Sequence, residues 1–168
     1  MPDNWDNNVL LSVLPSLRRF ALSLSRNTDD ADDLVQEVSL RLVRNGIPEG
    51  AELKHWSLRV CKNVWIDQLR RKKVRTDASA EVLAQSPTVE DGEGSLEGRS
   101  ELESVMQIMS TLPEDQQIAL SLVALEGMSY REVSEVMEVP MGTVMSRIAR
   151  ARKQIADRLA SQGEEAHD

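Results

Sequence analysis

A group of side chains in the last third of the sequence could contact the edges of base pairs. These side chains recur mostly at intervals of three or four residues, which places them largely on one face of a helix. They are Thr143, Ser146, Arg147, Arg150 and Lys153. Arginine can pair with guanine in the major groove of DNA, and serine can bond to base edges or to phosphates. The pattern favours a DNA-reading helix over the alternative, a solvated basic face on an ordinary surface helix.

The segments around this group predict a helix-turn-helix. Residues 129–132 have the composition of a capping box at the start of a short helix. Residues 138–142 predict a tight connection, and a longer helix follows over about residues 142–159. Its inward side chains would be Val144, Ile148, Ala151, Ile155 and Leu159. A short capped helix, a tight turn and a longer basic helix, in this order, are typical of a DNA-binding motif.

A second basic stretch lies in the first half of the chain. It holds six basic residues and one acidic residue between positions 62 and 75, and all of these except Arg75 lie within a helix predicted over about residues 53–73. The apolar side of that helix would include Trp56, Val60 and Val64. Arg70, Arg71, Lys72 and Lys73 could contact phosphates, or could complement the dipole at the C-terminal end of the helix.

Two earlier helices complete this half. One is predicted over residues 10–24, with Pro15 as a kink or a boundary. The next has Thr28 as its N-cap and an acid-rich first turn, and it ends near Gly46. An alternating strand pattern occurs nowhere in the sequence. The sequence therefore predicts an all-α fold class.

The acidic charge of the chain is unevenly distributed. The net charge of −8 over 168 residues argues against a nucleic-acid partner only if it is evenly spread. Residues 1–76 carry 13 basic and 10 acidic side chains, whereas residues 77–103 carry one and eight. Residues 77–100 contain Gly, Pro and Ser, lack apolar periodicity and predict a flexible acidic linker. We expect two small helical domains, residues 1–76 and 101–160, and a disordered tail at residues 161–168.

The composition gives little support to other classes of function. A single cysteine, Cys61, excludes a disulfide framework and a cysteine-rich zinc site. His55 and His167 lie far apart in sequence, and the chain has no Gly-rich phosphate loop. We expect no metal, no cofactor and no small-molecule substrate, and no enzymatic activity. The apolar runs are shorter than the roughly 20 residues of a membrane span, and no signal peptide is visible, so we expect a cytoplasmic protein.

Three motifs, in this order, resemble those of the bacterial extracytoplasmic-function (ECF) sigma factors of the sigma-70 family. Residues 30–37 (DADDLVQE) and residues 56–71 (WSLRVCKNVWIDQLRR) are similar to two stretches of the family's first domain. Residues 112–152, which include SYREVSEVMEVPMGTVMSR, are similar to the family's helix-turn-helix segment. The likeness covers nearly the whole chain outside the linker and the tail.

The resemblance implies a subunit that binds core RNA polymerase and directs promoter-specific transcription initiation. Sigma region 2 would bind the polymerase and open the −10 element, region 4 would read the −35 element, and a separate anti-sigma factor would hold the protein inactive. The implied polymerase-binding residues are Asp33, Leu34, Gln36 and Glu37. The implied −10 residues are Asn45, Val60 and Asn63 around a flipped-out base, with Arg70, Arg71, Lys72 and Lys73 on phosphates.

The sequence departs from the family pattern at several positions. The loop over residues 45–50 lacks an aromatic residue that could stack on a base. Met145 and Ala149 stand where longer base-reading side chains are common, so we expect an unusual −35 preference. Glu138 stands at a turn position where glycine is frequent, and a left-handed conformation there would cost about 1 kcal/mol.

Two alternatives stay open at this point. The chain could be a sigma-mimicking scaffold that titrates an anti-sigma factor, although it keeps Asn63, Ser146 and Arg150, which such a scaffold would lose. It could also be a stand-alone helix-turn-helix regulator, which would leave the first 76 residues unexplained.

Overall fold

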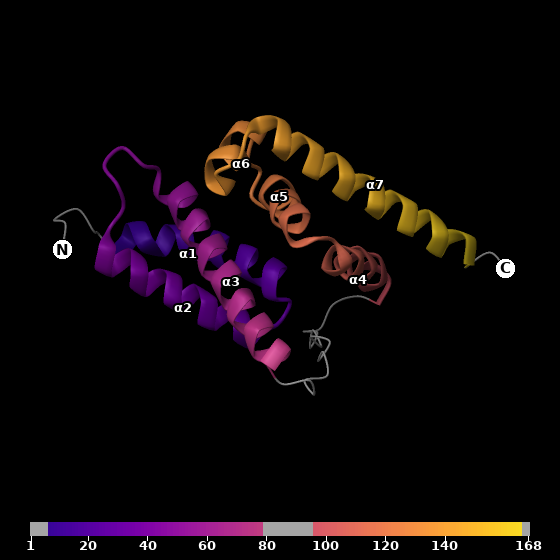
Figure 1. Ribbon diagram of the computed structural model, residues 1–168, viewed down its shortest axis with the longest axis horizontal. Helices are drawn as coiled ribbons and strands as arrows, with labels where there is room; N and C mark the ends of the chain where they lie inside the picture. Colours follow the sequence, from indigo (N-terminus) through magenta and orange to yellow (C-terminus); the bar gives the residue numbers. More distant parts are fainter. Residues whose placement is uncertain (1–6, 79–95, 166–168) are drawn as a thin grey trace. The chain divides into compact units, whose positions relative to one another are not determined.

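The computed structural model describes residues 7–78 and 96–165. These residues form seven helices and no strand, which confirms the predicted all-α fold class (Figure 1). Helices α1 (Asn7–Ser25), α2 (Thr28–Asn45) and α3 (Leu53–Ala78) form one compact unit. Helices α4 (Leu96–Thr111), α5 (Glu114–Ala124), α6 (Tyr130–Met137) and α7 (Met141–Glu165) form a second. The expectation of two small helical domains is therefore confirmed.

The first unit is a bundle in which each of the three helices packs against the other two. Leu17 and Phe20 of α1 and Leu34 and Leu42 of α2 are fully buried between the helices. Helix α1 continues through Pro15, which lies on its exposed side. The proline is therefore neither a boundary nor part of the core.

Helix α3 buries only part of the expected apolar side. Val64 is buried as expected, together with Leu58 and Cys61, whereas Trp56 and Val60 are only partly buried. The buried stripe and the expected stripe, which share Val64, both fit helical spacing, so the sequence alone does not separate them. The packing of α3 against α1 and α2 selects the first stripe and leaves Trp56 and Val60 beside a cavity described below.

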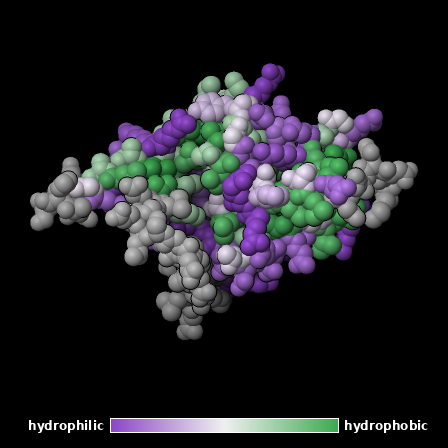
Figure 2. Space-filling model, turned by 180° about the vertical axis from the view of Figure 1, so that it is seen from behind, coloured by the Kyte–Doolittle hydropathy of each residue, from purple (hydrophilic) through white to green (hydrophobic). Residues whose placement is uncertain are grey.

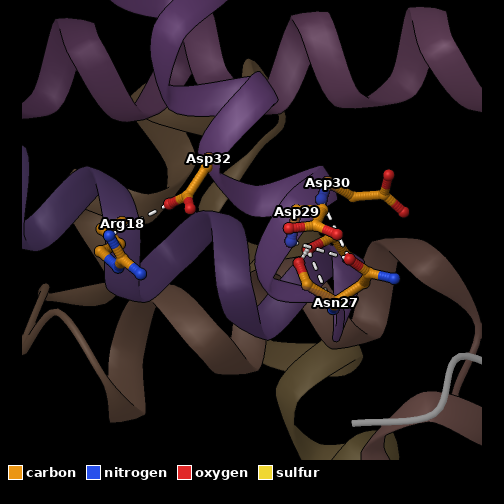
Figure 3. Close-up of polar contacts among 6 residues, drawn as sticks. Arg18, Asn27, Asp29, Asp30 and Asp32 are labelled. Carbon is orange, nitrogen blue, oxygen red and sulfur yellow. Dashed lines mark hydrogen bonds and ion pairs between the residues drawn. The ribbon is translucent and has the colours of Figure 1, made fainter. Parts of the chain in front are cut away.

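The first turn of α2 is capped one residue earlier than expected. Asn27 Oδ1 accepts hydrogen bonds from the backbone N–H groups of Asp29, at 2.8 Å, and Asp30, at 3.1 Å (Figure 3). Thr28 is therefore the first helical residue, since asparagine caps at least as well as threonine. On the same helix, Asp32 Oδ1 lies 3.1 Å from Arg18 Nη1, which links α2 to α1 at the surface (Figure 3).

In the second unit, α7 packs against α4, α5 and α6. Its inward residues Val144, Ile148 and Ala151 are buried as expected, and Ile155 packs partly buried against the cluster that contains Ala151. The expectation for Leu159 is wrong, since this side chain is exposed. It lies one turn beyond Ile155 and contributes nothing to that cluster.

The helix-turn-helix consists of α6, the connection after it, and α7. The predicted capping box is present, because Glu132 N–H donates to Ser129 Oγ at 3.1 Å and Ser129 N–H donates to Glu132 Oε1 at 3.2 Å. Glu138 has a left-handed backbone, with φ 59° and ψ 42°, and its N–H donates to the carbonyl of Ser134. The chain therefore turns sharply at a non-glycine residue.

Two helices extend further than expected. Helix α7 continues to Glu165, so residues 161–165 are helical rather than a disordered tail. The sequence from 156 to 165 holds strong helix formers and no proline, so nothing stops the helix at Leu159. Helix α3 reaches Ala78 and α4 begins at Leu96, so both ends of the expected linker are helical. The rest of the linker and residues 166–168 lie outside the described residues.

Candidate nucleic-acid interface

A cavity of about 370 Å³ lies in the first unit, between the end of α2, the loop that follows it and the first half of α3. Gly46 ends α2 with a φ of 69°, and its N–H donates to the carbonyl of Leu42 at 2.8 Å. This turn brings the loop over toward α3. The cavity is lined by Arg41, Leu42, Asn45, Gly46, Ile47, Pro48, Trp56, Val60 and Asn63. The structure thus brings together all three residues expected around a flipped-out base, namely Asn45, Val60 and Asn63.

The walls of the cavity combine an aromatic ring with amide groups. Trp56, Val60 and Asn63 follow one another at intervals of four and three residues, so they share one face of α3. The Asn63 side chain is exposed, and its amide can both donate and accept hydrogen bonds. The Arg59 guanidinium lies 5.1 Å from the centre of the Trp56 ring. Trp56 supplies the aromatic surface that the loop lacks, and its spacing from Asn63 was the signal that could have identified it.

Arg41 is a second residue of this cavity that sequence reasoning missed. Its Nη2 donates to Glu37 Oε1 at 2.9 Å, one turn earlier on α2. Gln68 Nε2 of α3 donates to the other carboxylate oxygen, Glu37 Oε2, at 3.3 Å. Glu37 therefore joins α2 to α3 and holds the Arg41 side chain. The Glu37 carboxylate is engaged within the unit, so it is less available for the predicted polymerase contact.

The basic run continues along α3 from the cavity. Arg70, Arg71, Lys72 and Lys73 are all exposed. Arg70 follows Asn63 by seven residues, which corresponds to about 10 Å along a helix. A strand whose base enters the cavity could therefore pass its phosphates along these side chains.

The exposed surface of α2 holds only part of the expected polymerase-binding set. Asp33 and Gln36 are exposed, and Glu37 is partly exposed. Leu34 is fully buried in the bundle core, so its assignment to a polymerase contact is wrong. It belongs to the apolar stripe that packs α2 against its neighbours, together with Val38 and Leu42.

The outward face of α7 carries most of the expected DNA-reading residues. Ser146, Arg150 and Lys153 are exposed, and Thr143 is partly buried. Ser146 Oγ donates to the carbonyl of Thr143 at 3.0 Å. The same face also exposes Met145, at 47% of its surface, and Ala149. Figure 2, which shows one whole face of the molecule, has hydrophobic side chains at the surface among hydrophilic ones.

Arg147 differs from the other expected DNA-reading residues. Its Nε lies 3.2 Å from Asp115 Oδ2 in the first turn of α5, and only 22% of its side chain is exposed. The Arg147 side chain thus forms an ion pair between α5 and α7. The structure does not group it with Ser146, Arg150 and Lys153.

The buried interior of the first unit holds one ionisable thiol. Burial raises the pKa of the Cys61 thiol to about 12, so the thiol stays protonated at neutral pH.

Within the described ranges, no three His, Cys, Asp or Glu side chains gather to form a metal site. None of the helices described is both long and apolar enough to cross a bilayer.

Comparisons with known proteins match both units. The family described as sigma-70 region 2 matches residues 10–75, and the family described as sigma-70, region 4 matches residues 102–155. The ECF RNA polymerase sigma factor EcfG of Rhodopseudomonas palustris is 33% identical over 158 residues, which is 93% of this chain and 86% of that protein. The ECF RNA polymerase sigma-E factor of Escherichia coli is 30% identical over 142 residues, which is 77% of this chain and 74% of that protein.

A solved structure shares the fold of the chain. It is the sigma factor RpoE of Bartonella quintana, co-crystallised with the anti-sigma factor NepR. The similarity has a TM-score of 0.80 and a sequence identity of 30%, and it covers 92% of this chain and 96% of that chain.

Proposed function

The chain belongs to the ECF sigma factors of the sigma-70 family, and from this membership we propose which of its surfaces meets core RNA polymerase and which meets each promoter element. It is a sigma factor that binds core RNA polymerase and directs promoter-specific transcription initiation. Members of the family act as transcription factors in the cytoplasm, where the RNA polymerase itself catalyses RNA synthesis. We therefore propose no enzymatic activity for this chain. We assign residues 1–76 to region 2 and residues 101–160 to region 4, with residues 77–100 as a linker whose two ends continue α3 and begin α4.

The cavity of the first unit is the proposed site for an unstacked base of the −10 element. The observation that carries this assignment is the meeting of Asn45, Val60 and Asn63 at one cavity, with the Trp56 ring in its wall. An amide can bond to a base edge, and an aromatic ring can stack on any base for about 1–3 kcal/mol. Such contacts offset the few kcal/mol that base unstacking costs. The basic run from Arg70 to Lys73 would hold the strand by its phosphates.

The outward face of α7 is the proposed site for the −35 element. A recognition helix of a helix-turn-helix lies in the major groove, with the residues of its first turns at the base edges. Ser146 and Arg150 are exposed in that part of α7, and Lys153 follows within one turn. We assign base contacts to Ser146 and Arg150, and a phosphate contact to Lys153.

The exposed acidic surface of α2 is the proposed contact with core polymerase. Asp33 and Gln36 present a carboxylate and an amide to solvent. A carboxylate in this position can pair with a basic helical surface, while Leu34 holds the helix in place from within the bundle.

An anti-sigma factor is a further partner that we infer for this chain. The support is the likeness, at 30% identity and over almost the full length of both chains, to a sigma factor crystallised with the anti-sigma factor NepR. The two alternatives, a titrating scaffold and a stand-alone regulator, are less well supported, because the relatives at 33% and 30% identity, which match 93% and 77% of this chain, are sigma factors.

Transcription with purified components tests the function. Core polymerase with and without the chain is given fragmented genomic DNA, and the 5′ ends of the transcripts are mapped. We expect transcripts that depend on the chain and share one −35 and one −10 sequence. Binding to core polymerase without any specific transcript would contradict the assignment.

A further inference from the structure

We propose that Met145 selects thymine in the −35 element through the 5-methyl group of that base. This inference rests on the proposed function, in which α7 occupies the major groove, and it adds a specificity-determining contact to it. Met145 and Ala149 lie one turn apart on α7 and are both exposed. They form a short apolar row beside the polar row of Ser146 and Arg150, which is offset by one residue.

The orientation of this row is fixed by the core. Val144 and Ile148 are fully buried against the rest of the unit, and they immediately precede Met145 and Ala149 in sequence. A rotation of α7 that hid Met145 would expose these two side chains to water. The Met145 side chain therefore stays at the surface, with 47% of its area exposed.

The polar groups near Met145 are partly engaged inside the domain. Arg147 forms its ion pair with Asp115, and the Ser146 hydroxyl donates a hydrogen bond to the Thr143 carbonyl. Arg150 remains exposed as the polar side chain suited to guanine. The neighbouring side chains of Met145 and Ala149 have no hydrogen-bond donor.

Thymine presents an apolar group in the major groove, its C5 methyl, alongside one acceptor. Methionine is unbranched and polarizable, so it can adapt to the position of such a group. The exposed Arg150 and Lys153 on the same helix face favour DNA over a protein as the partner of this surface, because they add attraction for phosphates.

Replacement of thymine by deoxyuridine, which lacks only the methyl group, tests the contact. Full-length protein with core polymerase is bound to a promoter fragment obtained from the transcription experiment above. Each −35 thymine, on either strand, is replaced in turn and the dissociation constant is measured. At one position we expect about three- to fivefold weaker binding, the effect of one buried methyl group. The Met145→Ala variant should bind the thymine fragment and the deoxyuridine fragment for that position equally. The Met145→Leu variant should still bind the thymine fragment more tightly.

Leu159→Ala is the matched control. Leu159 is an exposed apolar side chain on the same helix, about 21 Å from Met145 along the axis, so this variant should respond to deoxyuridine as the unaltered protein does. An element without thymine, no response at any thymine, or an undiminished response in Met145→Ala would each overturn the inference. Weaker binding of core polymerase by Met145→Ala, with the thymine response unchanged, would overturn it in favour of a protein contact. Failure of the proposed function is distinguishable, since then the transcription experiment yields no promoter fragment.

Discussion

Asn63 and Trp56 lie on one face of α3, which both packs in the bundle and lines the cavity proposed for a base. Both residues line the cavity, but Asn63 is exposed and Trp56 is partly buried. The aromatic ring thus forms a wall, while the exposed amide can bond to an incoming group. At the opposite side of α3, Cys61 is buried in the core.

Cys61 gives a prediction about stability and pH. Its pKa is raised in the folded state, so above pH 9 the unfolded chain loses this proton while the folded chain keeps it. The free energy of unfolding should therefore fall as pH rises from about 9 toward 12, by up to 1.4 kcal/mol per pH unit from this group. Denaturant unfolding at several alkaline pH values measures it.

The Cys61→Ala variant isolates the thiol from the other groups that titrate in this range. Its free energy of unfolding should fall less steeply with pH than that of the unaltered protein. Parallel curves for the two proteins would show that the thiol ionises equally in both states, and would contradict the prediction.

Residue types and spacing predict part of the candidate site, and packing decides the rest. The motif resemblance identified Asn45, Val60 and Asn63, because it carries positions over one by one. It could not identify Arg41, whose place depends on Glu37 and on Gln68, 31 residues further along the chain. Likewise, no local pattern shows that Arg147 pairs with Asp115 of α5 instead of facing outward.

At the scale of elements, local signals locate most helix boundaries. The capping box at Ser129 begins α6 where the sequence predicts it, and the turn at Gly46 ends α2 where the sequence predicts it. Both signals depend only on residues within a few positions of the boundary. Of the stripe that α3 buries, only Val64 is predicted, since two stripes that share Val64 fit helical spacing and only contact with α1 and α2 selects one. The ends of α3 and α7 are also missed, because charged and polar helix formers continue past the last apolar residue.

The left-handed turn at Glu138 yields a prediction about element stability. Glu138→Gly removes a side-chain clash with the backbone and should stabilise the second unit by up to about 1 kcal/mol. Glu135→Gly, the same change at an exposed position inside α6, should destabilise it by about 1 kcal/mol. Denaturant unfolding of both variants measures the two effects. If both changes destabilise to the same degree, the left-handed conformation carries no strain.

At the scale of the whole molecule, the net charge of −8 conceals two basic surfaces. Most of the acidic excess falls in residues 77–103, while the basic side chains concentrate on α3 and α7. Electrostatic attraction to DNA acts over about 10 Å at moderate salt concentration. Local basic surfaces can therefore contact phosphates although the chain as a whole is acidic.

The central claim is that the two units recognise different promoter elements. The cavity of the first unit selects a −10 base, and α7 of the second unit selects −35 bases. Run-off transcription tests it with the unaltered protein, Asn63→Ala and Arg150→Ala, on one promoter and on two derivatives, each with one element altered. Thermal unfolding and binding to core polymerase check that the variants are intact.

We predict that Asn63→Ala loses discrimination at the −10 element and keeps it at the −35 element, and that Arg150→Ala does the reverse. Each loss should correspond to about 1–3 kcal/mol, or roughly 5- to 150-fold in transcript ratio. The claim is contradicted if intact variants keep both discriminations, or if either variant loses both together.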